Sequence, residues 1–267
     1  MSGQEGQIAT EGNTPRRLGI QLAAASGVPL AVMLVAGFAA DIAIVLTTGG
    51  PPVLDPAKIG SELLRAKGST VWMVEAWLYT LMIIAVPAFI LGVYAALRRE
   101  GEPGLPGLGA IAALIFWLFH TIHNLGFVTV LQVVATGYTG AGAEGSAADA
   151  VARALLGFAN AAFGFGTSVG GVFLIGSMAC LGVATLQNGG LPRWTGYAAL
   201  AAAALALIAY LQVIVPALGP IFGIPGWLLH IAWVIGVAVA LVRGRTMSTS
   251  HRFGYAPAGV TTRLPPS

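Results

Sequence analysis

Two histidines stand three residues apart in a long apolar stretch. His120 and His123 lie within the run from 108 to 134, and Asn124 follows them. Spacings of three and four residues place all three side chains on one broad face of a helix. An ionisable side chain is costly in hydrocarbon, so its presence in a stretch long enough to cross a bilayer predicts a functional site.

The residue types suit a metal or haem centre. His120 and His123 can reach one metal from adjacent turns, and His230 completes a three-histidine set. A haem cannot take both as opposite axial ligands, because they project from one side of one helix, so His230 would supply the second. Glu75 or Asp41 are further ligand candidates for a metal. The chain has no HExxH or Cys-rich motif and no nucleophile with a base at a diagnostic spacing, so whether it is an enzyme stays open.

Polar side chains in the other apolar stretches are further candidates for a binding site. Tyr79 lies four residues after Glu75, which places both on one helix face. The predicted ligand-binding set is Asp41, Glu75, Tyr79, His120, His123, Asn124, Asn160 and His230.

The composition indicates that these residues are carried by a membrane protein. Hydrophobic residues make up 57% of the 267 residues and charged residues only 9%, against about 25% charged residues in soluble domains. We interpret the net charge of +3 as a consequence of membrane topology, because Lys and Arg gather in cytoplasmic loops, and not as a sign of nucleic-acid binding. The single cysteine, Cys180, excludes an intrachain disulfide and a cysteine metal cluster.

Hydrophobic runs predict an all-α bundle of six transmembrane helices in one domain, residues 16–245. The predicted spans cover residues 18–47, 71–97, 108–134, 160–186, 195–215 and 226–242. Residues 1–15 and 246–267 are polar and are predicted to be disordered cytoplasmic tails. A short amphipathic helix over 55–65 is predicted to lie on the outer membrane surface. Gly166 and Gly170 form a small-xxx-small pattern that places span 160–186 in the middle of the bundle or at a homodimer contact.

Charge sets the orientation of the spans. Nine of the 13 Lys and Arg residues fall in the tails and in the turns that this topology places inside, and four fall outside. Lys and Arg favour the cytoplasmic side, so we expect an inner-membrane protein with both termini in the cytoplasm.

The layout resembles a bacterial family. The turn Leu191-Pro192-Arg193-Trp194 opens the fifth span, and the last span carries Trp233 and ends in Leu241-Val242-Arg243. Together with six spans and a proline-bearing outer segment, these features resemble the family catalogued as domain of unknown function 4386, over about residues 15–245. The resemblance implies a six-helix inner-membrane protein and implies no reaction.

The predicted topology places the polar side chains in the outer half of the bundle. At 1.5 Å per residue, Asp41 lies about 9 Å from the outer end of its span, and Glu75 and His230 about 6 Å from theirs. Three interpretations follow. The first is an outward-facing polar pocket that binds or transports a small molecule or protons. The second is a metal- or haem-binding oxidoreductase using the histidine pair, and the third is a structural protein whose polar groups only hold helices together.

Overall fold

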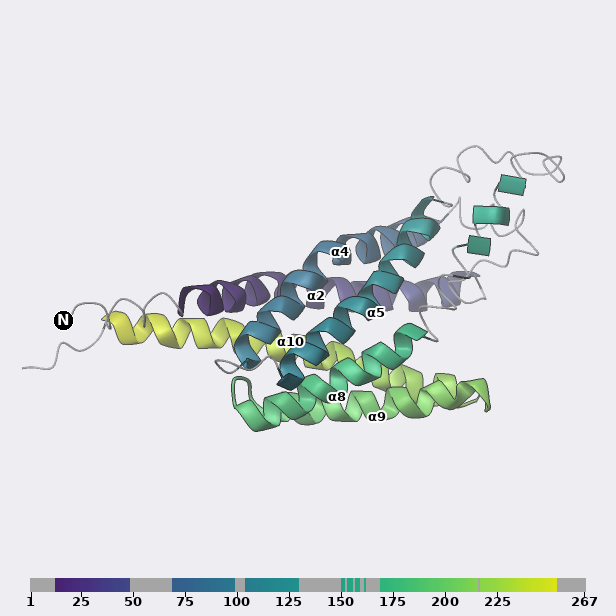
Figure 1. Ribbon diagram of the computed structural model, residues 1–267. Helices are drawn as coiled ribbons and strands as arrows, with labels where there is room; N and C mark the ends of the chain where they lie inside the picture. Colours follow the sequence, from purple (N-terminus) through teal and green to yellow (C-terminus); the bar gives the residue numbers. More distant parts are fainter. Residues whose placement is uncertain are drawn as a thin grey trace, which may run out of the picture.

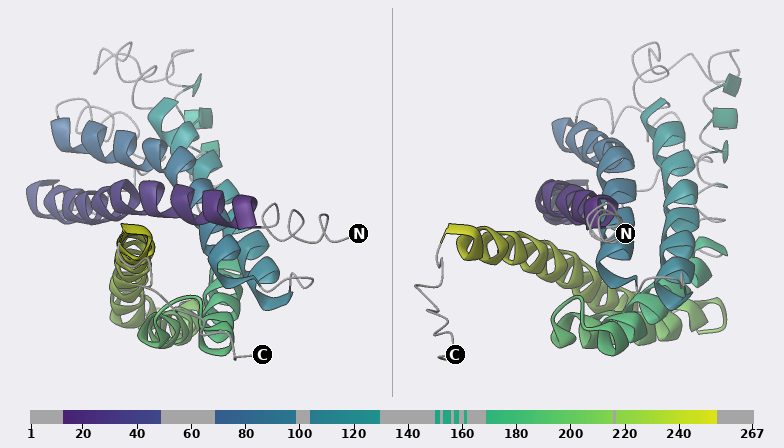
Figure 2. Two further views of the ribbon diagram at one scale, coloured as in Figure 1. Left: turned by 90° about the vertical axis from the view of Figure 1, so that its left-hand side faces the viewer. Right: turned by 60° about the vertical axis from the view of Figure 1, so that its left-hand side comes forward.

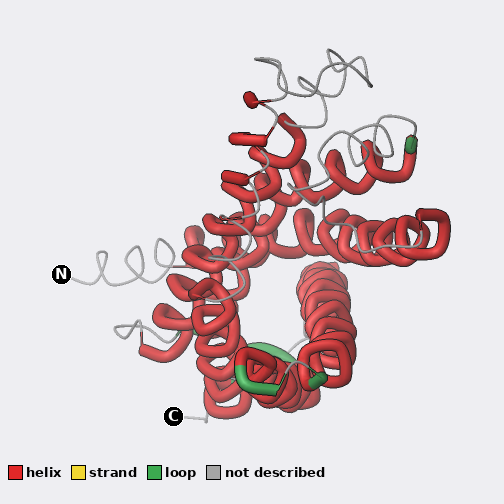
Figure 3. Tube along the Cα trace, turned by 90° about the vertical axis from the view of Figure 1, so that its right-hand side faces the viewer, coloured by secondary structure: helices red, strands yellow, loops and turns green. Residues whose placement is uncertain are grey.

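The described part of the chain is helical. The computed structural model describes residues 13–48, 69–98, 104–129, 150–151, 153–155, 157–158, 161, 169–215 and 217–253. Within these ranges there is no β-strand, so the all-α prediction is confirmed (Figure 3). The predicted surface helix at 55–65, Asn160 and Gly166 lie outside the described residues, as do residues 1–12 and 254–267.

Six α-helices and one 3-10 turn make up the main elements (Figure 1). They are α2 (Asn13–Thr48), α4 (Thr70–Leu97), α5 (Gly104–Thr129), α8 (Gly171–Asn188), α9 (Arg193–Tyr210), η4 (Leu211–Val213) and α10 (Leu218–Phe253). All of these helices except α9 contain a segment long and apolar enough to cross a membrane. The 18 residues of α9 open with Arg193-Trp194-Thr195-Gly196-Tyr197, so its apolar part is shorter than the helix. The described residues therefore show five spans of the predicted six.

The last helix begins earlier than its prolines suggest. The turn predicted around Pro220 and Pro225 is wrong, because α10 begins at Leu218 and contains both residues. Pro220 lies in the first helical turn, where the N–H groups have no partner within the helix, so it breaks no hydrogen bond. Pro225 lies inside the helix and lacks the N–H that would bond to the carbonyl of residue 221. His230 lies 12 residues after the first residue of α10, which is about 18 Å along the helix axis. The same helix continues to Phe253 and so extends into the predicted tail.

The six helices form a closed ring in chain order. Each packs on the helix before it and the helix after it, and α10 packs on α2 to close the ring. Helix α8 lies in the ring between α5 and α9 and barely contacts α4. The predicted central position of span 160–186 is therefore wrong for the part of it that is described.

Small residues allow the helices to approach closely. A Cβ at Gly92 of α4 would collide with Ala23 and with the Gly19 carbonyl of α2. Where α2 crosses α10 (Figure 2), a Cβ at Gly27 would lie 2.9 Å from that of Ala238. Gly182 of α8 and Gly196 of α9 face each other in the same way, each leaving room for the other's carbonyl. Gly182 of α8 thus serves a contact inside the bundle, as expected for a small residue between membrane helices.

The turn between α8 and α9 is tied to the end of α4. Gly189 ends α8 with a φ of 69°, a left-handed conformation that favours glycine. Just before it, the Asn188 side-chain amide donates a 2.7 Å hydrogen bond to the Leu97 carbonyl. Arg98 and Arg193 therefore lie at the same end of the bundle.

Candidate functional site

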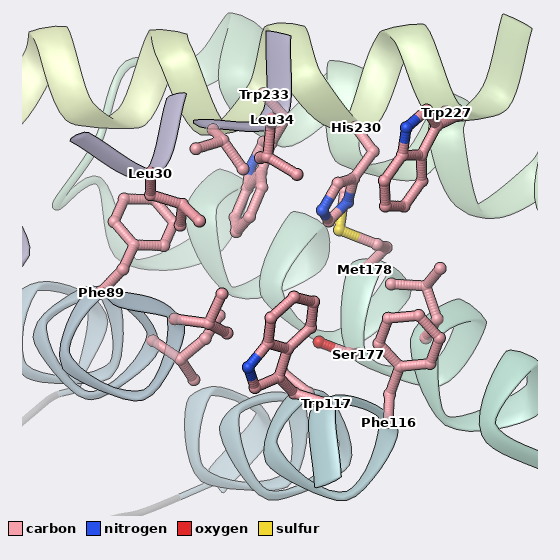
Figure 4. Close-up of a pocket in the computed structure, with 15 residues that line it drawn as sticks. Leu30, Leu34, Phe89, Phe116, Trp117, Ser177, Met178, Trp227, His230 and Trp233 are labelled. Carbon is pink, nitrogen blue, oxygen red and sulfur yellow. The ribbon is translucent and has the colours of Figure 1, made fainter. Parts of the chain in front are cut away.

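A cavity lies at the centre of the ring, where five helices meet. Its volume is about 40 Å³, enough for water-sized guests. Figure 4 shows it enclosed by rings and branched side chains. We call it the central cavity. It is lined by Leu30, Leu34, Val86, Phe89, Ile90, Ala113, Phe116, Trp117, Leu174, Ser177, Met178, Trp227, His230, Trp233 and Val234.

One face of α10 supplies an aromatic stack around His230. The spacing Trp227-x-x-His230-x-x-Trp233 places three rings on successive turns of one face. The His230 ring stacks on Trp227 at a centroid distance of 5.2 Å and an interplanar angle of 12°. Its other neighbour is Trp233, at 5.9 Å. In Figure 4 the His230 ring reaches from α10 toward Met178, so it lies inside the bundle and away from lipid.

A similar stack lies on α5. His120 packs on Phe116 at a centroid distance of 4.7 Å and on Trp117 at 5.8 Å. The two histidines are close enough for His230 to act electrostatically on His120. The structure therefore brings together two predicted site residues that are 110 positions apart in the chain.

Three nitrogen atoms around the central cavity have no hydrogen-bond partner. They are Trp117 Nε1, Trp233 Nε1 and His230 Nδ1, and all three are buried. Indole N–H groups can only donate, and an imidazole nitrogen can donate or accept. A buried polar group without a partner costs free energy, so these atoms favour a guest that brings hydrogen-bond acceptors.

A second, larger cavity shares a wall with the first. This side cavity has a volume of about 150 Å³ and lies between α8, α9, η4 and α10. Its lining includes Ala202, Ala206, Ala209, Tyr210, Gln212 and Gly223. Leu174, Met178, Trp227 and His230 line both cavities, so these four side chains form the wall between them. An apolar cavity of about this size can hold an aromatic ring such as benzene.

A separate polar group lies between α2 and α4. The Tyr79 hydroxyl donates a hydrogen bond of 3.1 Å to Asp41 Oδ2. Glu75 interacts with Asp41 through both a side-chain hydrogen bond and charge. Gly37 leaves room for the phenol, because a Cβ there would lie 3.3 Å from Tyr79 Cζ. None of these three polar side chains lines the central or the side cavity.

The predicted site residues thus form two groups and not one pocket. Asp41, Glu75 and Tyr79 form the first group, and His120 and His230 belong to the second. His123 acts on His120 through charge. Asn124 is buried on α5, and its amide nitrogen has no partner.

The three-histidine metal set is not assembled. Among the described residues, no three His, Cys, Asp or Glu side chains gather closely enough to hold a metal ion. His120 and His230 instead pack against aromatic rings of their own helices.

Most of the aromatic lining was missed from the sequence. Trp117, Trp227, Phe89 and Met178 read as ordinary apolar residues of membrane spans. The signal that identifies part of the lining is the spacing of three between Trp227, His230 and Trp233, which is visible without a structure. Ser177, whose hydroxyl points toward the Trp117 ring in Figure 4, carries no such signal.

Comparison of the chain with protein-family models, with curated proteins and with solved structures gave no match. The geometry of the two cavities is therefore the main indication of function.

Proposed function

We propose that this protein binds a small neutral molecule that carries a ring and a hydrogen-bond acceptor, inside a bundle of six membrane-spanning helices. The ring occupies the side cavity against Trp227 and His230, and the acceptor meets the unpaired His230 Nδ1 in the shared wall. The observation that carries the proposal is His230, an imidazole with an unpaired buried nitrogen in the wall between two cavities.

The lining argues for a neutral ligand. Apart from His230, the linings of the two cavities contain no Asp, Glu, Lys or Arg side chain. A cation would leave water without a carboxylate to pair with, and an anion would meet no Lys or Arg. Burying an unpaired charge costs far more than burying an apolar ring. A neutral molecule can also enter from the bilayer, where it is concentrated.

The proposal includes the orientation in the membrane. We place α9 across the bilayer as the sixth span, because it packs between α8 and α10 in the ring. Both termini then lie on the side that carries most of the Lys and Arg residues, which is the cytoplasmic side of an inner membrane.

A matched pair of probes tests the binding site. Acetophenone and α-methylstyrene have the same shape, but only acetophenone has a carbonyl oxygen to accept a hydrogen bond. We expect acetophenone to raise the melting temperature of detergent-purified protein more than α-methylstyrene does. In His230→Phe, which keeps a ring but removes the nitrogen, this difference should shrink.

A cavity-filling variant locates the site. Ala206→Leu puts three extra carbons into the side cavity and should abolish stabilisation by both probes. Ala204→Leu is the control, because it makes the same change on the exposed face of α9. Equal stabilisation of wild type and Ala206→Leu by acetophenone would show that the ring binds elsewhere.

A further inference from the structure

The polar group between α2 and α4 is a second candidate site, independent of the cavities. It consists of the acid pair, Asp41 and Glu75, together with the Tyr79 hydroxyl. A cluster of acids by itself does not make a site. Here, however, Glu75 is only 7% exposed, and its Oε2 atom is buried without any hydrogen-bond partner. A charged carboxylate with an oxygen that receives no hydrogen bond is costly at this burial, and the smallest ligand that removes the charge is a proton.

The contacts of the two acids differ, and the difference decides which one holds the proton. Asp41 is half-buried and accepts the Tyr79 hydrogen bond, which stabilises its anionic form. Glu75 lies deeper and receives no such donor at Oε2. Two carboxylates side by side, out of water, do not both stay charged. The proton therefore belongs on Glu75, in the side-chain hydrogen bond that joins Glu75 to Asp41.

The neighbouring helices bring other titratable groups near these elements. Helix α5 packs on α4 and carries His120 and His123, and α10 packs on α2 and carries His230. The charge that acts on Glu75 comes from Asp41. The acids act on each other, and the charges that act on His120 come from His123 and His230, so the proton exchange is local to the acid pair.

A metal ion fits the acid pair less well than a proton does. Hard cations take six or more oxygen ligands, and this group offers two carboxyl groups and one phenol that is already donating.

We propose that Asp41, Glu75 and Tyr79 form a membrane-embedded site that holds one exchangeable proton on Glu75. Loss of this proton places two negative charges between α2 and α4, so the protonation state is coupled to the packing of these helices. The O–H bond breaks on Glu75, and the proton leaves to water by way of half-buried Asp41. No oxidant or other reactant is required.

Two measurements on the full-length protein in lipid vesicles test the site. The first is the infrared carbonyl band of a protonated carboxyl group at neutral pH, which should shift on exchange into deuterated water. The second is labelling by dicyclohexylcarbodiimide, which attacks protonated carboxyl groups in apolar surroundings, with the labelled residue located by mass spectrometry. We expect the label on Glu75 and the loss of both band and label in Glu75→Gln.

Two variants on neighbouring positions separate this role from mere packing. Tyr79→Phe removes the donor that keeps Asp41 anionic, so part of the label should move to Asp41. Thr80→Val removes a hydroxyl that only donates to the Ala76 carbonyl of its own helix at 2.8 Å, so band and label should match the wild type. The proposal is overturned if Glu75→Gln folds and keeps the band, or if wild-type Glu75 stays unlabelled at neutral pH.

Discussion

Trp233 is the residue whose packing best reports on the centre of the bundle. It is 1% exposed, meets Phe89 edge to face at a centroid distance of 5.9 Å and contacts His230. Its removal leaves a large space that neighbouring helices cannot close. We therefore expect Trp233→Ala to lower the free energy of unfolding by about 3–5 kcal/mol.

Chemical denaturation of the protein in mixed micelles would measure this loss. Trp77→Ala is the control, because Trp77 is 47% exposed on the outer face of α4, and its change should stay within about 0.5 kcal/mol. Equal losses for the two variants would mean that Trp233 is not enclosed as described.

Residues also show how far a sequence can predict this site. Apolar runs predicted α2 and α4 within a few residues at each end, because hydrocarbon thickness sets a minimum length for a span. Asp41, Glu75 and Tyr79 are predicted site residues because ionisable and polar groups are rare in such runs. Their separation from His230 was not predictable, because helical spacing shows which residues share a face but not which face the next helix meets. The beginning of the last helix was predicted too late because Pro220 and Pro225 were interpreted as part of a loop, while α10 contains both.

At the scale of elements, the contact between α8 and α9 depends on two glycines. A Cβ at Gly182 would lie 2.9 Å from Leu200 Cγ and 3.0 Å from the Gly196 carbonyl oxygen. The backbone oxygen cannot move aside without shifting a helix. Gly182→Val should therefore cost about 1–3 kcal/mol of stability through overpacking.

Gly176 provides the comparison on the same helix. No atom lies within 4 Å of a Cβ added there, so Gly176→Ala should be neutral or slightly stabilising through helix propensity. Thermal unfolding followed by circular dichroism would rank the two variants, and a reversed order would contradict the packing of α8 on α9.

The hydrogen bond between the α8–α9 turn and the end of α4 contributes less to the free energy of unfolding than the glycine contact does. Asn188→Ala removes the donor to the Leu97 carbonyl. We expect a loss of about 1 kcal/mol, typical of one neutral hydrogen bond. Asn188→Gln, which keeps the amide one carbon further out, should restore only part of the loss, and the same unfolding measurement covers both variants.

At the scale of the whole molecule, the number of crossings can be tested at the two ends of α9. Cys180 is the chain's single cysteine, so Cys180→Ala gives a background free of thiols. Pro192→Cys and Val215→Cys then place one thiol at an exposed position before or after the helix. A membrane-impermeant maleimide added to intact cells should label the thiol at 215 only, and the thiol at 192 should react only after the cells are opened. Labelling of both from one side would mean that α9 does not cross.

The closure of the ring by α2 and α10 has a consequence for biogenesis. The chain is inserted from its N-terminus, so α2, α4 and α5 enter the membrane long before α10 has been synthesised. Until then lipid must cover the surface of α2 around Gly27 that later receives Ala238. This contact joins segments more than 200 residues apart, and such distant contacts form slowly. A ribosome-bound chain that stops before α10 would be an open arc with no central cavity, so ligand binding should appear only when the last helix is released.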